Sequence, residues 1–238
     1  MASVQAAADV ESPGFFRRNH APRLISGFVI TAVLIVAYLF GIFSYKAGLA
    51  QDFREPSPPA GGVSVVIFPQ KVSADDQTLP AQVALFAAPD LKDASGLLTR
   101  GIELRIEPAV NGQAALTFPA GEPPAPQGIV LPAPGIVQKY PFDSYDVSAT
   151  VHATALPADT ADAIAVDANA RSADAVDAVA TEASFFFRVP GWSEENTLSA
   201  NGSGTGKVVS TQVVRDGSTK SIALLLLLLM IILPKSTA

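Results

Sequence analysis

The sequence predicts a mainly β protein: an immunoglobulin-like antiparallel β-sandwich ectodomain with an N-terminal transmembrane α-helix and a short C-terminal hydrophobic helix. Three observations lead to this fold class. Short apolar segments recur between Val63 and Val214, and clusters of Gly, Pro, Asn and Asp separate them, as in antiparallel sandwiches. A run of twenty residues without a charge, 24–43, precedes these segments, and a twelve-residue apolar run, 222–233, follows them. Between the two apolar runs, the 238-residue chain leaves room for about one ordinary domain.

The first apolar run predicts a membrane anchor. At about 1.5 Å per residue, a helix over 24–43 covers the roughly 30 Å hydrocarbon core of a bilayer. Three arginines stand before the run, while Lys46 and Arg54 stand behind it, so the positive-inside bias favours a cytoplasmic N-terminus. We therefore expect a cytoplasmic tail over residues 1–23, a transmembrane helix over 24–45 and a plasma-membrane protein whose main domain is extracytoplasmic.

A cleaved signal peptide is the alternative for this segment. Gly48-Leu49-Ala50 places small residues at the two positions that a signal peptidase reads. The apolar run is longer than the roughly 7–15 residues of a usual signal-peptide core, which favours the anchor. Both interpretations export the rest of the chain.

A linker and a β domain are expected to follow. Residues 46–62 include QDFREPSPPAGG, whose Pro and Gly residues cannot continue a helix, and they predict a spacer. The β domain then occupies residues 63–220. In Ile102–Ile106, apolar and charged residues alternate with the period of a half-buried strand. Further strands are expected at Val63–Phe68, Ala81–Ala87, Ala114–Phe118, Ile129–Val137, Tyr145–Ala155, Ser184–Val189 and Lys207–Val214.

An Ala/Asp-rich segment, residues 156–183, interrupts the strand pattern. Alanine favours helix, yet the segment has no continuous apolar stripe. We interpret it as a solvated insertion between two strands, with a turn or two of helix around Ala173–Ala180. Its potential oxygen ligands Asp167, Asn169 and Asp174 lack the spacing and the central glycine of an EF-hand, so we expect no metal site.

The C-terminal apolar run, residues 221–234, predicts a partial second membrane helix. Its twelve apolar residues cover only about 18 Å as a helix, well short of the bilayer core. The run is either the start of a second span or a hydrophobic tail that dips into the outer leaflet.

Composition and motifs argue against several function classes. The formal net charge of −6 repels phosphate backbones, so we expect no nucleic-acid partner. The chain has no cysteine, which removes disulfides, thiolate nucleophiles and zinc–thiolate sites. Of the two histidines, His20 and His152, only His152 lies in the predicted β domain, and no G-x-S-x-G motif accompanies it. The NGSGTGK segment lacks P-loop spacing and is interpreted as a hairpin loop. We expect no catalytic residue and no cofactor.

The most distinctive local sequence is KYPFDSY, at the start of the long alternating strand. Proline fixes φ near about −65°, Phe142 is expected to fold into the core beneath the turn, and Asp143 is expected to accept backbone N–H bonds as an Asx turn. The predicted structural corner comprises Tyr140, Pro141, Phe142, Asp143 and Tyr145, together with the only tryptophan, Trp192. Its Pro-Phe-Asp sequence is also similar to a turn on the membrane-facing side of the Cys-loop ligand-gated channel ectodomain, although the flanking cysteines are absent.

Four motifs carry a family resemblance. They are FPAG at Phe118–Gly121, YPFDSY at Tyr140–Tyr145, PGW at Pro190–Trp192 and RDGSTKS before the C-terminal apolar run. In this order the chain resembles the domain of unknown function 4436 family, bacterial membrane proteins common among mycobacteria and their relatives. The resemblance implies an N-terminal membrane helix, an extracytoplasmic domain, further C-terminal helices and no established activity. The chain departs from the pattern in its large Ala/Asp segment and its short C-terminal run.

These observations favour a non-enzymatic envelope protein that acts as a binding or interaction module. Its expected partners are the lipid bilayer and another envelope or membrane protein. One alternative is a sensing or accessory domain of a channel or transporter, coupled to the membrane through the Pro-Phe-Asp turn. The other is an extracytoplasmic hydrolase, which needs a pocket where carboxylates such as Asp143, Asp146 and Glu103 meet.

Overall fold

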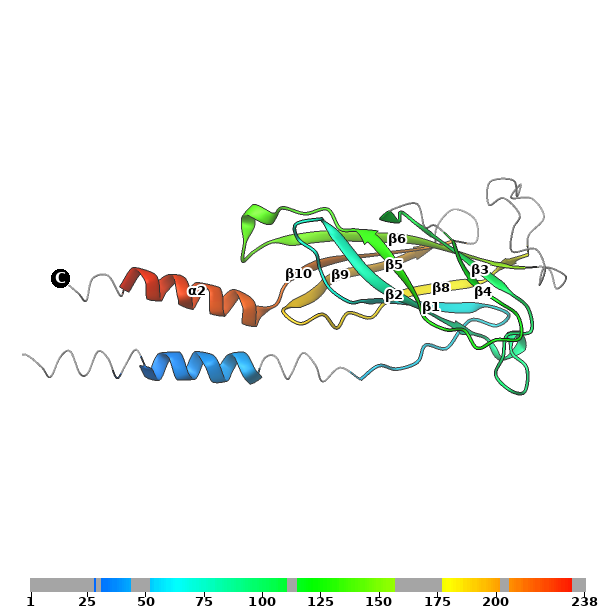
Figure 1. Cartoon of the computed structure of the whole chain (residues 1–238), viewed down its shortest axis with the longest axis horizontal. Coiled ribbons are helices and arrows are strands. Elements are labelled where there is room, and N and C mark those ends of the chain that lie inside the picture. The colour runs from blue at the N-terminus through cyan, green and yellow to red at the C-terminus, as the bar shows by residue number, and fades with distance from the viewer. Residues whose placement is uncertain are drawn as a thin grey trace, which may run out of the picture.

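The protein is mainly β, with ten strands in two sheets over the part of the chain that the structure describes (Figure 1). This computed structural model describes residues 28, 31–43, 52–110, 115–156, 177–201 and 206–232. The strands are β1 (Val63–Pro69), β2 (Thr78–Ala87), β3 (Ile102–Glu107), β4 (Ala115–Phe118), β5 (Gln127–Pro132), β6 (Ser144–Ala155), β7 (Ala178–Val179), β8 (Thr181–Phe185), β9 (Trp192–Asn201) and β10 (Lys207–Arg215). They are accompanied by the 3-10 turns η1 (Pro89–Leu91) and η3 (Val137–Lys139) and by the helix α2 (Gly217–Ile232).

Several predicted features lie outside the described residues. They are the tail 1–23 with His20, the ends of the predicted anchor, the Gly48-Leu49-Ala50 cleavage site, residues 157–176 with Asp167, Asn169 and Asp174, and residues 202–205 of the NGSGTGK loop.

The sheet topology departs from a purely antiparallel arrangement at one place. The first sheet has the order β5-β2-β1-β8, and the second has the order β4-β3-β6-β10-β9, with the short β7 paired to β6. All pairs are antiparallel except β1 and β8, which run parallel with Val63 opposite Thr181. The prediction of antiparallel pairing is therefore wrong for this pair. A parallel pair needs a long crossover, and here the chain from β2 to β7 supplies it.

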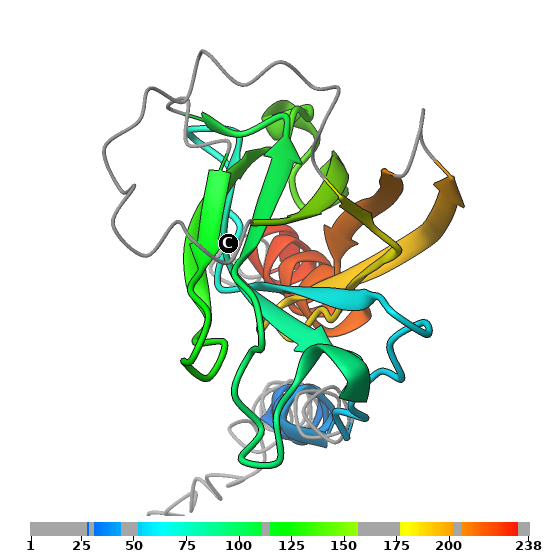
Figure 2. The same ribbon diagram turned by 90° about the vertical axis from the view of Figure 1, so that its right-hand side faces the viewer.

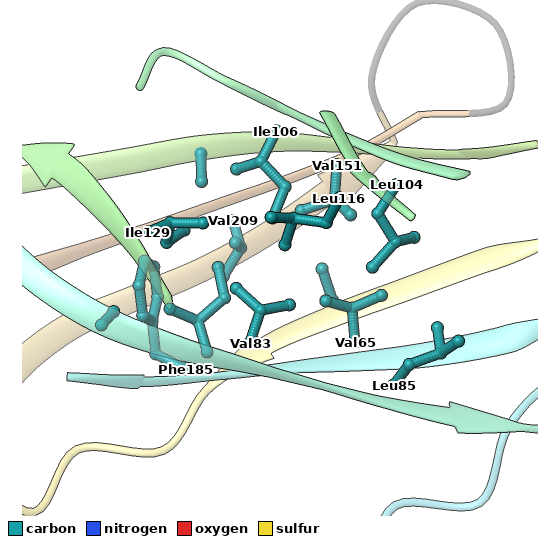
Figure 3. Close-up of a cluster of buried hydrophobic side chains, with 14 of the residues drawn as sticks. Val65, Val83, Leu85, Leu104, Ile106, Leu116, Ile129, Val151, Phe185 and Val209 are labelled. Carbon is teal, nitrogen blue, oxygen red and sulfur yellow. The ribbon is translucent and has the colours of Figure 1, made fainter. Parts of the chain in front are cut away.

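The core lies between the two sheets. Figure 3 shows side chains of the first sheet, such as Val65 and Val83, facing Ile106 and Val151 of the second sheet across one apolar layer. The predicted alternation is confirmed in β3, where Ile102, Leu104 and Ile106 are buried while the intervening side chains are half-buried or exposed. In β6 it holds along the strand, with inward positions at Tyr145, Val147, Ala149, Val151 and Ala153.

Some predicted elements are corrected by the structure. The strand expected to reach Val137 ends at Pro132, because Val137 belongs to η3. The strand expected at Ser184–Val189 begins and ends earlier, at Thr181–Phe185, so it overlaps the last three residues of the predicted Ala/Asp insertion. Residues 178–179, expected in a helical turn, pair with β6 as β7. The strand β9 was not predicted, and it is exposed along almost its whole length.

The predicted linker is not a simple spacer, because one of its side chains packs on the β domain. The Phe53 ring lies 5.3 Å from the Phe68 ring, 5.9 Å from the Phe86 ring and 5.1 Å from the Phe186 ring, as centroid distances. These rings come from β1, β2 and the residue after β8, on the face of the first sheet that points away from the core. The contact with Phe186 is edge-on and the other two are tilted, and aromatic pairs of this kind add to the stabilisation from burial. Phe53 therefore holds the end of the linker against the first sheet through these ring contacts.

Two helical segments extend from the same end of the β domain (Figures 1 and 2). Phe28 and residues 31–43 are the described part of one, and α2 forms the other. They touch, since a Cβ placed on Gly41 would lie 3.4 Å from Ile222 Cδ1. Helix α2 begins at Gly217, ahead of the predicted boundary at 221. Among the described residues, no helix is both long and apolar enough to cross a membrane.

Candidate functional site

The candidate site is the place where the β domain joins α2, which we call the α2 junction: Tyr140, Asp143, Tyr145, Trp192 and Arg215. Its centre is the Asp143 carboxylate, whose side chain is only 1% exposed. Arg215 Nε donates to both carboxylate oxygens, at 3.1 Å to Oδ1 and 3.3 Å to Oδ2. The Tyr145 hydroxyl donates to Oδ2 at 3.2 Å. A buried carboxylate is stable only when it is paired and hydrogen-bonded, and both conditions are met here.

Aromatic rings hold the Arg215 guanidinium in position. Its Cζ atom lies 3.8 Å from the centre of the Trp192 ring and 5.4 Å from the centre of the Tyr140 ring. The Tyr145 ring meets Trp192 edge-on at 5.5 Å. Arginine suits this place because its flat cation stacks on aromatic faces while it still donates to a carboxylate.

The electrostatics of the α2 junction keep the Tyr145 hydroxyl protonated beside Asp143. Burial, followed by the neighbouring Asp143, raises the pKa of Tyr145, so its hydroxyl keeps the proton that it donates. The Asp143 carboxylate accepts hydrogen bonds from the Arg215 cation and from this hydroxyl. The arrangement can tie strands and a helix together.

The α2 junction continues into the first turn of α2. Asp216 Oδ1 accepts hydrogen bonds from Thr219 N at 2.7 Å and from Ser218 Oγ at 2.9 Å, which caps the helix. Burial alone would raise the pKa of Asp216, but the hydrogen bonds from Thr219 and Ser218, with the nearby Lys220 charge, hold it below its ordinary value. Both Asp216 N, at 3.1 Å, and Thr219 Oγ1, at 3.3 Å, donate to Gly191 O in the turn before Trp192.

The structure brings most of the predicted corner together and places one member elsewhere. Tyr140, Asp143, Tyr145 and Trp192 all meet around Arg215. Phe142 does not fold into the core, because its side chain is 55% exposed, so that prediction is wrong. Pro141 is half-buried between them. Phe142 lies in the turn before β6, where Phe142 N donates to Lys139 O, and the next residue, Asp143, is the one that is buried.

Two further corrections concern Asp143 and its main partner. The Asp143 carboxylate accepts from the side chains of Arg215 and Tyr145, and not from backbone N–H groups as the Asx-turn prediction requires. Arg215 itself was missed by sequence reasoning, because it lies 72 residues from Asp143. The available signal was its place in RDGSTKS, between the last strand pattern and a helix-capping Asp-x-x-Thr.

The structure does not bring together the other residues considered as candidate catalytic or metal-binding groups, among the residues that it describes. Glu103 lies opposite Thr154 at the far end of β6, whereas Asp143 precedes that strand. At about 3.3 Å per residue, the eleven steps from Asp143 to Thr154 span roughly 36 Å, too far for a pair of catalytic carboxylates. The His152 imidazole packs against the backbone of Gly206. In the part of the chain that the structure describes, no three potential ligand side chains gather into a metal site.

Comparison with known proteins gives the family. A family model described as a domain of unknown function (DUF4436) matches residues 53–214. The chain belongs to the DUF4436 family. The DUF4436 match begins at Phe53, the residue that clips the linker to the first sheet, and it ends one residue before Arg215. It therefore covers nearly all of the β domain and every residue of the α2 junction except Arg215. None of the curated proteins compared with the chain matches it.

Proposed function

We propose that this protein is a membrane-anchored cell-envelope protein whose β domain, an immunoglobulin-like sandwich, is a non-enzymatic binding module. The observation that carries the anchor is the exposed apolar surface of the two helical segments. Phe28, Val36 and Phe43 are 76%, 66% and 72% exposed in one, and Leu227 and Met230 are 58% and 75% exposed in α2. Apolar helices of this kind, outside a protein core, belong in lipid.

Residues 24–45 form the anchor in this proposal, with residues 1–23 in the cytoplasm and the β domain outside the plasma membrane. The uncharged run and the preceding arginines support this orientation. The DUF4436 membership is compatible with it.

The free edge of the second sheet supports the binding role. Strand β9 ends this sheet, and its ten residues lie beside β10 alone (Figure 2). A long exposed edge strand offers backbone donors and acceptors to a strand of another protein. We propose that β9 takes an envelope or membrane protein partner. A photo-crosslinking residue at Leu198 is expected to capture one protein from intact cells, while the same residue at Ser148, exposed on the central strand β6, captures none. Equal capture at both positions would contradict the assignment.

A sensing or accessory role beside a channel or transporter is the second candidate. It is favoured by the α2 junction, because Arg215 and Asp216 tie the corner to the first turn of α2 without a linker. A Leu226→Asp change is expected to abolish this role if α2 works within the membrane, and unchanged membrane insertion of that variant would exclude it.

The topology of the anchor is tested by protease digestion of intact spheroplasts that express the full chain. We expect the β domain to be degraded while an N-terminal peptide ending near the linker stays protected. A mature chain that starts at Gln51 and is free of membrane, or a β domain that survives until the cells are lysed, would refute the anchor.

A further inference from the structure

The loop between β5 and β6 concentrates exposed apolar side chains. In this segment, residues 133–143, which we call the η3 loop, Ile136 is 51%, Val137 36%, Tyr140 60% and Phe142 55% exposed. Outside the two helical segments, the described residues include only two other exposed large apolar side chains, Phe53 and Leu198. Single exposed apolar residues are ordinary, but four in one loop mark an interaction surface.

The fold holds these side chains outward. Within the η3 loop, Tyr140 N donates to Val137 O at 3.2 Å and Phe142 N donates to Lys139 O at 2.6 Å. At its base, Asp146 N donates to Pro134 O at 2.9 Å, and Arg215 pairs with Asp143. The exposed residues are therefore presented on a braced loop.

The position of the η3 loop indicates which surface it contacts. Figure 1 shows the loop at the end of the β domain from which α2 leaves, level with the first turn of that helix. The exposed apolar residues of α2, from Ile222 onward, begin one turn further along the same direction. If α2 enters lipid there, the loop lies at the height of the lipid head groups.

The chemistry of the loop fits that surface. Tyrosine is enriched at membrane interfaces, where its ring sits in the apolar boundary and its hydroxyl among head groups. Lys139 is the only charged residue between Ala133 and Phe142, and it is exposed. A single lysine next to aliphatic and aromatic side chains suits an anionic lipid surface, although the protein as a whole is acidic.

We propose that the η3 loop inserts Ile136, Val137, Tyr140 and Phe142 into the outer leaflet, with Lys139 among the lipid phosphates. This proposal rests on the proposed function, in which the helical segments anchor the chain. It adds a second, lipid-facing contact that fixes how the β domain stands on the bilayer.

The absence of cysteine from the chain permits a direct depth measurement. Single cysteines at Val137, Phe142, Leu198 and Leu34 in the full-length protein carry a spin label, and each variant is reconstituted into vesicles of phosphatidylethanolamine and phosphatidylglycerol. Accessibility to oxygen, which concentrates in lipid, is compared with accessibility to a water-soluble nickel chelate. Leu198 is the matched control, because it is an apolar residue on β9 that is 67% exposed.

We expect the labels at 137 and 142 to lie about 5–10 Å below the head-group boundary, as for interfacial side chains, and the label at 198 to stay in water. Labels at 137 and 142 that match the one at 198 would overturn the proposal. So would labels that are shielded from water but not accessible from lipid, since this result indicates a protein contact.

The label at position 34 separates the two proposals. If it lies in lipid while 137 and 142 lie in water, the loop insertion is wrong and the anchor stands. If 34 is in water while 137 and 142 lie in lipid, the loop contact is supported and the anchor is wrong. A further variant carries the spin label at position 140 (Tyr140→Cys) together with Val137→Asp and Phe142→Asp. The two added charges are expected to move this label from lipid into water. A label depth that the two changes leave unaltered would contradict the insertion.

Discussion

At the scale of single residues, Arg215 is the most connected side chain of the α2 junction. It neutralises the buried Asp143 and stacks on Trp192 and Tyr140, so one cation satisfies a carboxylate and fills the space between two rings. Removing it leaves a carboxylate in the interior with only the Tyr145 hydroxyl as partner. Loss of one partner from a buried ion pair is among the most damaging single changes.

An Arg215→Ala change is expected to lower the free energy of unfolding by about 3 kcal/mol, because Asp143 becomes an unpaired buried charge. Trp192 is the only tryptophan, so its fluorescence during urea unfolding reports on this position directly. The matched control is Arg105→Ala, which removes an ion pair to Glu107 of similar length, 3.3 Å, between two side chains that are more than half exposed. We expect the control to change stability by less than about 1 kcal/mol. Equal losses of unfolding free energy in both variants would show that the buried Arg215–Asp143 pair stabilises the fold no more than an exposed ion pair does.

The helix cap at Asp216 predicts a pH dependence. Because hydrogen bonds lower the folded-state pKa of Asp216, its contribution is fully present above the ordinary carboxyl pKa of about 4 and is lost as the pH falls through the lower folded value. An Asp216→Asn variant keeps a capping side chain without a titrating group. Thermal unfolding is expected to show the wild type more stable than this variant at neutral pH, with the difference shrinking below pH about 4. A difference that stays constant down to acidic pH would contradict the cap assignment.

At the scale of elements, β3 and β6 could be predicted because each has one buried and one exposed face. Apolar and polar residues therefore alternate along these strands in the sequence. Strand β9 could not be predicted, since the segment from Trp192 to Asn201 is exposed on both faces and carries no such alternation. The corner was predicted as a group of residues, but the direction of Phe142 was wrong. Arg215 joins the site only through the pairing of β10 with β6, which no local pattern encodes.

The base of the η3 loop depends on a glycine. A Cβ on Gly135 would overlap the Ser144 carbonyl oxygen and the Tyr145 ring. A Gly135→Ala change is therefore expected to lower the free energy of unfolding by about 1–3 kcal/mol and to disturb the Tyr145 contact with Trp192. Urea unfolding with near-ultraviolet circular dichroism measures both effects. Gly128→Ala on β5 is the control, since nothing lies within 4 Å of its Cβ position, and it is expected to be neutral or slightly stabilising. A neutral Gly135→Ala variant would show that the turn has room to adjust.

At the scale of the whole molecule, the two-layer architecture could be predicted and its connectivity could not. The number and spacing of apolar segments indicate two sheets around one core. The parallel pairing of β1 with β8, however, joins segments more than a hundred residues apart, and either strand alone is compatible with other neighbours. Likewise, nothing local to the Pro-rich linker shows that Phe53 packs on the outer face of the first sheet.

Phe53 is expected to control access to the linker. A Phe53→Ala change removes three ring contacts, each worth about 0.5–1.5 kcal/mol, so the segment before β1 should leave the sheet more often. In limited digestion, trypsin is expected to cut after Arg54 several times faster in this variant than in the wild type. Mass spectrometry of the early fragments measures this rate. Leu198→Ala, which removes an exposed side chain on β9, should leave the rate at Arg54 unchanged. An unaltered rate in Phe53→Ala would mean that the rings do not hold the linker.

The direct passage from β10 into α2 has a mechanical consequence. Only Asp216 separates the last residue of the strand from the first residue of the helix, and β10 is hydrogen-bonded along both edges, to β6 and to β9. A force that pulls α2 along its axis therefore loads two rows of backbone hydrogen bonds in shear, where they resist together instead of opening one by one. By contrast, a pull on the linker acts first on the Phe53 rings alone. The C-terminal end is therefore stiff from the start, whereas the N-terminal end gives until the Phe53 contacts break and the load reaches β1, which is paired with both β2 and β8.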